Sequence, residues 1–359
     1  MEITKLTPAV KAYIWGGEKL KNYGKTADGI IAETWELSFH KDGMCLTPNG
    51  RSLAEVVTAA DLGENVKNFD FFPMLIKFID AADNLSVQVH PSDAYSLKNE
   101  GQLGKTEMWY VVDAEQGAGL YMGFKRDVSQ EEFAEAIKNN TVTDLLNFIE
   151  VKKGEHYFIK SGTVHAIGKG TTICEIQQNS NVTYRVYDYD RRDAQGNARP
   201  LHIEKAKAVS DLSGGMPVSP AIKAGNCSLI SACKYFTVHS MRVEDSLAFN
   251  VDGGSFAAVS CVEGKGSIGG VAISAGDTLF IPAEYGEVKA EGKFTALIST
   301  VRAYSADVKE QGGVFTVTVR DDLGFVLTET SVACGNATDA VNKALSPFGM
   351  DCADLKKAL

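Results

Sequence analysis

The sequence predicts a mainly β protein with two β-sandwich or barrel domains and a small helical insertion. Three observations support this fold class. Apolar and polar residues alternate with the period of two expected for strands, as in residues 31–39 and 184–192. Short apolar runs then follow at the close spacing of an all-β domain, at 235–242, 255–262, 278–282 and 294–301. Segment 154–162 is similar to segment 276–284, each being a glycine turn, a hydrophobic strand and a further turn, which indicates a weak duplication.

In residues 1–128 the pattern predicts strands separated by turns and short helices. Ser52 and Glu55 have the spacing of a capping box, so a short helix is expected to begin there. A helical turn is expected at 92–98. Period-two alternation and runs of β-branched and aromatic residues predict strands at 71–80, 84–91, 105–112 and 119–124.

Residues 129–149 are expected to form a helical insertion among the strands. Ser129 and Glu132 have the spacing of a second capping box, and apolar residues follow it at helical spacing, namely Phe133, Ala136 and Ile137. Beyond the insertion we expect strands and then one short helix, at 157–159, 171–178, 184–192 and 202–209.

Turn-forming residues set the expected domain limits. Segment 213–220 is rich in Ser, Gly and Pro and is typical of a linker. We therefore expect a first domain at 1–212, a second at 221–310 and a C-terminal extension at 311–359. The extension is expected to hold two strands and then helices near 338–345 and 351–358, and the sequence assigns it no role.

The composition is that of an ordinary globular protein, since 44% of the 359 residues are apolar and 23% are charged. A formal net charge of −10 and the lack of a long basic run argue against nucleic-acid binding. Seven cysteines without a C-x-x-C pair are typical of reduced thiols. The start has no signal-peptide pattern, and no apolar run approaches the roughly 18–20 residues that cross a bilayer. We therefore expect a cytoplasmic protein that does not bind membranes.

A set of metal-ligating side chains is predicted on separate strands. Gln88 and His90 are two residues apart in one strand, so their side chains share a face. Glu107 opens another strand, and His165 follows a later glycine turn. Two imidazoles, a carboxylate and an amide could close around one divalent cation, as zinc accepts imidazole nitrogen and carboxylate oxygen. The other histidines are interpreted as ordinary structural residues: His40, His156, His202 and His239.

Cationic side chains lie in the strands and turns near these predicted ligands, namely Lys77, Lys105, Arg185, Arg191 and Arg192. An arginine fork binds phosphate through two hydrogen bonds and a lysine acts as a point charge, although many such residues are simply solvated. Glu175 is interpreted either as a buried partner of Arg185 or as a general base. The sequence has no P-loop, no dinucleotide-binding glycine motif and no G-x-S-x-G, so nucleotide hydrolysis, nicotinamide chemistry and serine-esterase chemistry lack support.

Four motifs carry a resemblance to a known family: LSVQVHP at 85–91, GKTEMWYVV at 104–112, SGTVHAIGKG at 161–170 and ICEIQQNSNVTYRVYDYDR at 173–191. They resemble the type I mannose-6-phosphate isomerases in their shorter bacterial form. The resemblance implies two cupin (jelly-roll) domains, of which only the first holds metal, with one Zn²⁺ per chain. It also implies interconversion of mannose 6-phosphate and fructose 6-phosphate by proton transfer between C1 and C2 through an enediol.

The same resemblance implies roles for particular residues. The expected zinc ligands are Gln88, His90, Glu107 and His165. The expected catalytic groups are Arg185, which would hold the phosphate, Glu175 and Lys105, and the base is left open between Glu175, Lys105 and a water on the metal. The expected substrate-binding groups are Trp15, Glu33, Lys77, Ser86 and Arg191.

The sequence departs from the family pattern at three positions. Lys160 stands where a cupin motif usually has proline, Ile167 where longer members carry tyrosine, and Asn181 where they carry aspartate. The resemblance therefore does not define the finer sugar contacts.

Two other functions stay open at this point. His90, Glu107 and His165 match the ligand set of an iron-dependent cupin oxygenase. A non-catalytic cupin that binds a sugar phosphate would keep the same fold without turnover. The isomerase hypothesis predicts that the protein binds a small phosphosugar substrate and is a monomer or a weak homo-oligomer.

Overall fold

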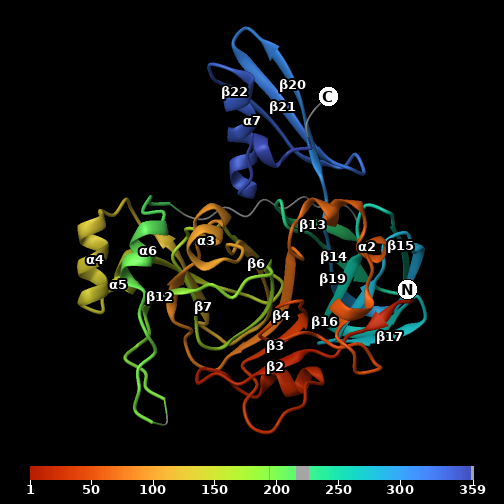
Figure 1. Ribbon diagram of the computed structural model, residues 1–359, viewed down its shortest axis with the longest axis horizontal. Helices are drawn as coiled ribbons and strands as arrows, with labels where there is room; N and C mark the ends of the chain where they lie inside the picture. Colours follow the sequence, from red (N-terminus) through yellow and green to blue (C-terminus); the bar gives the residue numbers. More distant parts are fainter. Residues whose placement is uncertain (194, 216–225, 357–359) are drawn as a thin grey trace. The chain divides into compact units, whose positions relative to one another are not determined.

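The computed structural model describes residues 1–193, 195–215 and 226–356 (Figure 1). Its contacts divide the chain into two compact units that interleave in sequence. Unit 1 comprises Met1–Leu6, Thr47–Pro73 and Ser219–Leu359, and unit 2 comprises Thr7–Leu46 and Met74–Val218. The consecutive domain limits expected from the sequence stay a prediction, and residues 216–220 of the expected linker, like the expected start of the second domain at 221, lie outside the described residues.

Unit 2 is built from two antiparallel sheets. The six-stranded sheet has the order β2 (Ala9–Lys11), β3 (Glu33–Leu37), β4 (Met74–Ala81), β11 (Thr171–Gln178), β6 (Glu107–Ala114) and β9 (His156–Ile159). The five-stranded sheet has the order β12 (Tyr184–Tyr187), β5 (Val87–Val89), β10 (His165–Ile167), β7 (Gly119–Phe124) and β8 (Leu146–Glu150). Strands that neighbour in space are far apart in the chain, as expected for a jelly roll.

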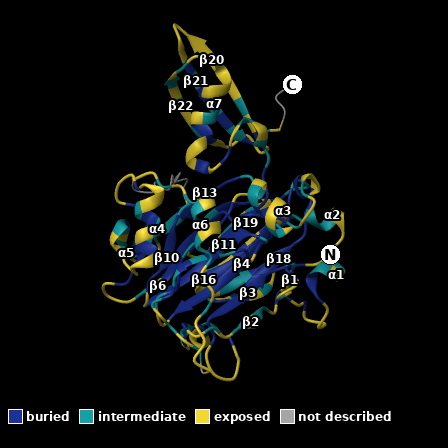
Figure 2. Ribbon diagram, turned by 60° about the vertical axis from the view of Figure 1, so that its left-hand side comes forward, coloured by how far each residue is buried: buried dark blue, intermediate teal, exposed yellow. Residues whose placement is uncertain are grey.

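A hydrophobic core joins the two sheets of unit 2. Trp109 and Ile173 of the six-stranded sheet pack in one buried cluster with Leu120 and Met122 of the five-stranded sheet. All eight residues of β4 and all eight of β11 are buried, because these are central strands covered on both faces. Figure 2 shows these strands in the dark blue of buried residues.

Short helices cover the outer face of the five-stranded sheet. Val87 and Val89 of β5 pack with Phe133 in one cluster, so these two valines face away from Gln88 and His90 as the period of two predicts. The covering helices are α4 (Gln130–Lys138), α5 (Val142–Leu145) and α6 (Ile203–Val209), of which α4 contacts both of the others (Figure 1). Two further helices of unit 2 are η1 (Lys19–Tyr23) and α3 (Asp93–Glu100).

The segment expected to be helical at 129–149 begins as predicted and ends differently. The Ser129 side chain accepts a hydrogen bond from the Glu132 backbone and so caps α4. Residues 146–149 belong to strand β8, which pairs with β7. From Asn147 to Glu150 burial alternates with the period of two of a strand, since Asn147 and Ile149 are half-buried while Phe148 and Glu150 are exposed.

The main sheet of unit 1 confirms the all-β character expected for the second half. Its order is β1 (Thr4–Lys5), β18 (Thr278–Ile281), β16 (Ala257–Ile268), β19 (Gly286–Thr300), β14 (Thr237–Val243) and β13 (Cys227–Ala232), with β15 (Ser246–Val251) on β19 and β17 (Val271–Ser274) on β16. Short helices from residues 47–73 belong to this unit: α1 (Leu53–Val56), α2 (Ala59–Leu62) and η2 (Glu64–Asn68). The capping box predicted at Ser52 is not formed, and Thr58 with Asp61 forms one instead.

The C-terminal part of unit 1 is a three-stranded sheet with one helix against it. Phe315, Val317 and Val319 alternate along β21 and pack on Val341 and Leu345 of α7. The two strands and the first helix expected within 311–359 are β21 (Val314–Asp321), β22 (Val326–Ala333) and α7 (Ala337–Leu345), and the remaining strand of the sheet, β20 (Tyr304–Gln311), ends where that segment begins. The second expected helix was wrong as far as the described residues go, since α7 is followed there only by the 3-10 turns η3 (Ser346–Phe348) and η4 (Cys352–Asp354).

Within the described part of the chain, the structure has no helix long and apolar enough to span a membrane.

Candidate active site

Three of the four predicted metal ligands meet in unit 2. His90 follows β5, His165 opens β10, and Glu107 opens β6 of the opposite sheet, so the cluster joins the two sheets. One ligand atom from each residue lies within 4.8 Å of the others, and all three side chains are buried. Among the described residues this is the one group of histidine, cysteine and carboxylate side chains with such spacing.

Backbone carbonyls fix the orientation of both imidazoles. Nδ1 of His90 lies 2.8 Å from the carbonyl oxygen of Val182, and Nδ1 of His165 lies 2.9 Å from that of Thr163. Because a carbonyl can only accept, each Nδ1 donates and each Nε2 is left as an acceptor that faces the cluster, where Nζ of Lys105 lies 3.2 Å from Nε2 of His90. Burial lowers the pKa of both histidines, that of His165 to about 4. Both rings are therefore neutral near pH 7, as a metal ligand must be.

The Glu107 carboxylate is buried with one oxygen left unpaired. Oε1 lies 3.3 Å from Nε2 of His165 and accepts no hydrogen bond, while Oε2 lies 2.5 Å from Nζ of Lys105. Burial raises the pKa of Glu107, and the Lys105 charge opposes that rise. Oε2 also lies 3.8 Å from Nε2 of His90, so one buried carboxylate and two neutral imidazole nitrogens form a donor set that fits a divalent cation.

Gln88 lies beside this cluster on the same strand face as His90. Its Nε2 lies 3.4 Å from Nε2 of His165, and its Oε1 accepts from Ser86 at 3.4 Å. Ligation by Gln88 therefore requires its amide to rotate so that the oxygen faces the imidazoles. The two ends of an amide have nearly the same shape, so such a rotation needs little repacking.

Two buried lysines and two further carboxylates extend the cluster. Glu175 of β11 sits opposite Lys77 of β4 in the ladder, and their side chains approach to 3.5 Å. Lys77 also lies 3.4 Å from Glu33, and Lys105 lies 3.5 Å from Glu175. Burial would raise the pKa of Glu175, yet Lys105 and Lys77 outweigh it and hold that pKa below its usual value. Glu175 is therefore ionised near neutral pH.

Tryptophan side chains orient the two outer carboxylates in the same way. Nε1 of Trp109 donates to Oε2 of Glu175 at 2.9 Å, and Nε1 of Trp35 donates to Oε2 of Glu33 at 2.7 Å. Oε1 of Glu175 accepts no hydrogen bond. This oxygen therefore has lone pairs that remain available to a substrate proton.

The predicted arginine lies one contact away from the metal-ligand cluster. Arg185 of β12 pairs with Gln88 of β5, and its Nε donates to Oγ of Ser86 at 3.1 Å. Sequence reasoning did not single out Asp188 or Arg199, which form an ion pair at 2.5 Å and join Arg191 to the same carboxylate. The only sequence signal was the polar turn at 193–197. A turn alone does not predict that the chain after it runs back alongside β12 and brings Arg199 close to Asp188.

Trp15 differs from the other predicted site residues. Its side chain is 4% exposed and packs in the apolar core between the sheets, with the ring of Tyr13 5.6 Å away. Its role in substrate binding stays a prediction.

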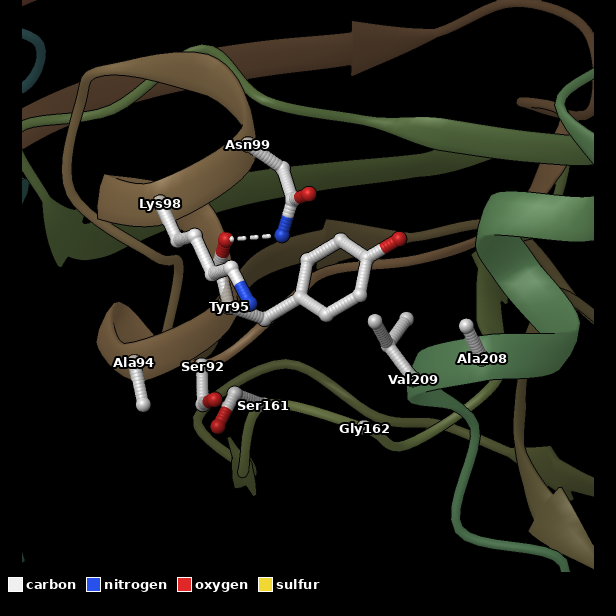
Figure 3. Close-up of a pocket in the computed structure, with 9 residues that line it drawn as sticks. All are labelled: Ser92, Ala94, Tyr95, Lys98, Asn99, Ser161, Gly162, Ala208 and Val209. Carbon is white, nitrogen blue, oxygen red and sulfur yellow. Dashed lines mark hydrogen bonds between the residues drawn. The ribbon is translucent and has the colours of Figure 1, made fainter.

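A surface depression of about 540 Å³ lies elsewhere in unit 2 (Figure 3). Figure 3 shows the Tyr95 ring between α3 and the α6 residues Ala208 and Val209, with the Asn99 amide hydrogen-bonded to the Tyr95 carbonyl at 2.7 Å. Lys98 is the one charged residue that lines it, and none of the predicted site residues does. Its lining therefore includes no histidine, cysteine or carboxylate side chain that could hold a metal ion.

The two antiparallel sheets of unit 2 and the buried His–Glu–His cluster between them define the class of this protein. It is a cupin with side chains placed to bind a metal ion. Family models agree with that class: residues 226–301 match the cupin domain of mannose-6-phosphate isomerase, and residues 3–117 match the catalytic domain of phosphomannose isomerase type I. Mannose-6-phosphate isomerase ManA of Bacillus subtilis is 34% identical over 309 residues, which cover 81% of this chain and 96% of the relative. The chain therefore belongs to the type I phosphomannose isomerase family, and it is an isomerase.

Other relatives and solved structures agree. Mannose-6-phosphate isomerase of Streptococcus mutans is 38% identical over 283 residues, covering 75% of this chain and 89% of the relative. The crystal structure of the Bacillus subtilis mannose 6-phosphate isomerase has a TM-score of 0.76 at 30% identity and covers 83% of this chain and 99% of its own. A mannose 6-phosphate isomerase structure with bound zinc and yttrium shares the fold, with a TM-score of 0.69 at 18% identity, over 83% of this chain and 99% of its own.

Proposed function

We propose that this protein interconverts mannose 6-phosphate and fructose 6-phosphate in a Zn²⁺-dependent reaction, with one ion per chain. The observation that carries the proposal is the pair of neutral imidazoles, whose Nε2 atoms lie 3.8 Å (His90) and 3.3 Å (His165) from oxygens of the buried Glu107 carboxylate. The relatives named above as mannose-6-phosphate isomerases support the choice of substrate. A cytoplasmic location and a monomeric or weakly associated state stay predictions.

His90, Glu107 and His165 would hold the zinc ion, with Gln88 as a fourth ligand after rotation of its amide. When bound, the ion supplies a Lewis acid that stabilises negative charge on the substrate oxygens at C1 and C2 as the enediol forms. Two lysines and three carboxylates make up the wider cluster, so the protein side chains alone carry an excess of negative charge. That excess favours a cation there.

Arg185 would bind the phosphate of the substrate and so fix which carbons reach the acid–base groups. Its Nε is held by Ser86 and its Nη1 by the carbonyl of Pro200 at 3.1 Å, so the guanidinium is oriented before substrate arrives. A fixed arginine fork suits a phosphate better than a mobile lysine.

Glu175 would move the proton between C1 and C2. It is ionised, Trp109 orients its Oε2, and its Oε1 accepts no hydrogen bond from the protein. Lys105, at 3.5 Å from that oxygen, would stabilise the carboxylate before Glu175 takes the proton and after it has returned the proton. We favour Glu175 among the candidate bases weighed from the sequence, because it is ionised and one of its oxygens accepts no protein hydrogen bond.

A coupled assay for fructose 6-phosphate formed from mannose 6-phosphate tests the proposal. We expect turnover with mannose 6-phosphate and much weaker turnover with unphosphorylated mannose, because the phosphate anchors the sugar. Glucose 6-phosphate serves as a phosphorylated control that differs at C2. A folded, zinc-loaded protein that turns over none of these sugars would contradict the proposed function.

A further inference from the structure

Three arginines gather beside one buried carboxylate at the end of β12. Asp188 binds Arg191 at 2.6 Å and Arg199 at 2.5 Å. Burial lowers the pKa of Arg185, and the positive charge of Arg199 lowers it further. Arg191 also lowers this pKa and Asp188 raises it, as expected for an arginine that lies close to these three side chains. Even with the exposed Asp83, which is 3.5 Å from Arg191, cations outnumber carboxylates here. Such an arrangement attracts an anion.

The three guanidinium groups differ in how many nitrogens remain free. Arg191 uses all three: Nε donates to the Asp188 carbonyl, Nη1 to the Asn84 carbonyl, and Nη2 to the Asp188 carboxylate. Arg185 uses Nε and Nη1, and Arg199 uses Nε and Nη2 on Asp188. Among the described residues, no acceptor meets Nη2 of Arg185 or Nη1 of Arg199.

The backbone brings these two free nitrogens to the same part of the fold. The amide of Arg185 donates to Nδ1 of His202 at 3.2 Å, and the amide of His202 donates to the Arg185 carbonyl at 2.8 Å. Nη1 of Arg185 donates to the carbonyl of Pro200, the residue after Arg199. The segment 199–202 therefore runs alongside Arg185, although the polar turn separates them in sequence.

We propose that Arg199 is the second phosphate-binding group of this enzyme, and that Asp188 and Arg191 are positioning residues. In this arrangement Nη2 of Arg185 and Nη1 of Arg199 donate to the phosphate oxygens, while Asp188 holds Arg199 through two hydrogen bonds. The inference rests on the proposed function, since the anion is the phosphate of the sugar substrate. It assigns Arg191 to support of the site, because each of its three nitrogens already donates to an acceptor within the protein.

Calorimetric titration of the zinc-loaded full chain with inorganic phosphate tests this assignment without requiring turnover. We expect Arg199→Gln and Arg185→Gln each to weaken phosphate binding by about 10- to 100-fold, the factor that one hydrogen bond between charged groups contributes. The matched control is Arg192→Gln, which removes the same charge from an exposed arginine of the same turn and should change the affinity less than about twofold. Arg199→Gln should also raise KM for mannose 6-phosphate by a similar factor while kcat changes less.

Asp188→Asn tests the positioning role. We expect it to reduce the preference for fructose 6-phosphate over unphosphorylated fructose, because Arg199 loses one of two charged contacts that fix its fork. A purely structural role would lower the melting temperature and leave that preference unchanged, and this result would overturn the assignment of Asp188.

Wild-type phosphate affinity in folded Arg199→Gln overturns the proposal for Arg199. If that variant does not fold, Arg199→Lys is titrated instead, since it keeps the charge and loses the fork. Weaker phosphate binding by Arg199→Lys supports the proposal, and unchanged binding overturns it. The wild-type protein could bind phosphate through Arg199 and still show no isomerase turnover. That result would support the phosphate site and contradict the proposed function, so failure of the site and failure of the proposed function are distinguishable.

Discussion

Replacing Glu175 with glutamine separates proton transfer from the other roles of the cluster. Glutamine keeps the size of the side chain and can still accept the hydrogen bond from Trp109, which is 2.9 Å long. It lacks a basic oxygen, so kcat should fall by about 10²- to 10⁴-fold, the usual contribution of a positioned general base. That loss corresponds to about 3–5 kcal/mol in the activation free energy.

The same substitution should leave the fold and the metal site intact. Lys77 keeps Glu33 at 3.4 Å and Lys105 keeps Glu107 at 2.5 Å, so neither ammonium group is left without a carboxylate. The free energy of unfolding should therefore fall by less than the roughly 3–5 kcal/mol that a buried charge left alone costs. Zinc content should stay at one ion per chain, because Glu175 is outside the ligand cluster.

Glu33→Gln provides a matched comparison in the same assay. Glu33 also accepts from a tryptophan Nε1, at 2.7 Å from Trp35, and also pairs with Lys77, at 3.4 Å. As a substrate-binding group it should affect KM more than kcat. A Glu175→Gln protein with full zinc content and wild-type kcat would refute Glu175 as the base.

Three further predictions concern the metal, pH and packing. His165→Ala should lose zinc and activity by metal analysis and coupled assay, whereas His156→Ala, outside the cluster, should keep both. Burial, followed by the charge of Arg302, lowers the pKa of His239 to about 4. As pH falls, His239 of the unfolded chain therefore takes up a proton at a higher pH than His239 of the folded protein. The free energy of unfolding should fall by up to about 3 kcal/mol as pH drops from about 6.5 to about 4. Urea unfolding of His239→Gln should lack this part of the pH dependence. Phe133→Ala removes a fully buried ring and should lower the free energy of unfolding by about 3–5 kcal/mol in the same measurement.

The sequence predicted the strands that carry the site because their signals are local. The β-branched run at 171–178 and the glycine-bounded run at 119–124 match β11 and β7 residue for residue. The alternation at 84–91 placed Gln88 and His90 on one face, and the packing of Val87 and Val89 on the other face confirms it. Periodicity was sufficient where a strand has one polar and one apolar face.

Features that depend on distant contacts were missed. Strand β15 (Ser246–Val251), which pairs with β19, was not predicted, although Leu247, Phe249 and Val251 are the less exposed residues and recur at every second position. Of the second C-terminal helix expected at 351–358, the described residues up to 356 show only the 3-10 turn η4 (Cys352–Asp354), capped by Asp351. The approach of Arg199 to Asp188 depends on the return of the chain after a polar turn, which spacing alone cannot predict.

Stepwise zinc titration of chelated protein, with turnover of mannose 6-phosphate measured at each step, tests the central claim most directly. The account predicts no turnover without metal and a linear rise that ends at one zinc per chain, since the His90–Glu107–His165 cluster supplies one site among the described residues. Full turnover by protein that analysis shows to be free of metal, or no turnover at saturating zinc, would contradict it.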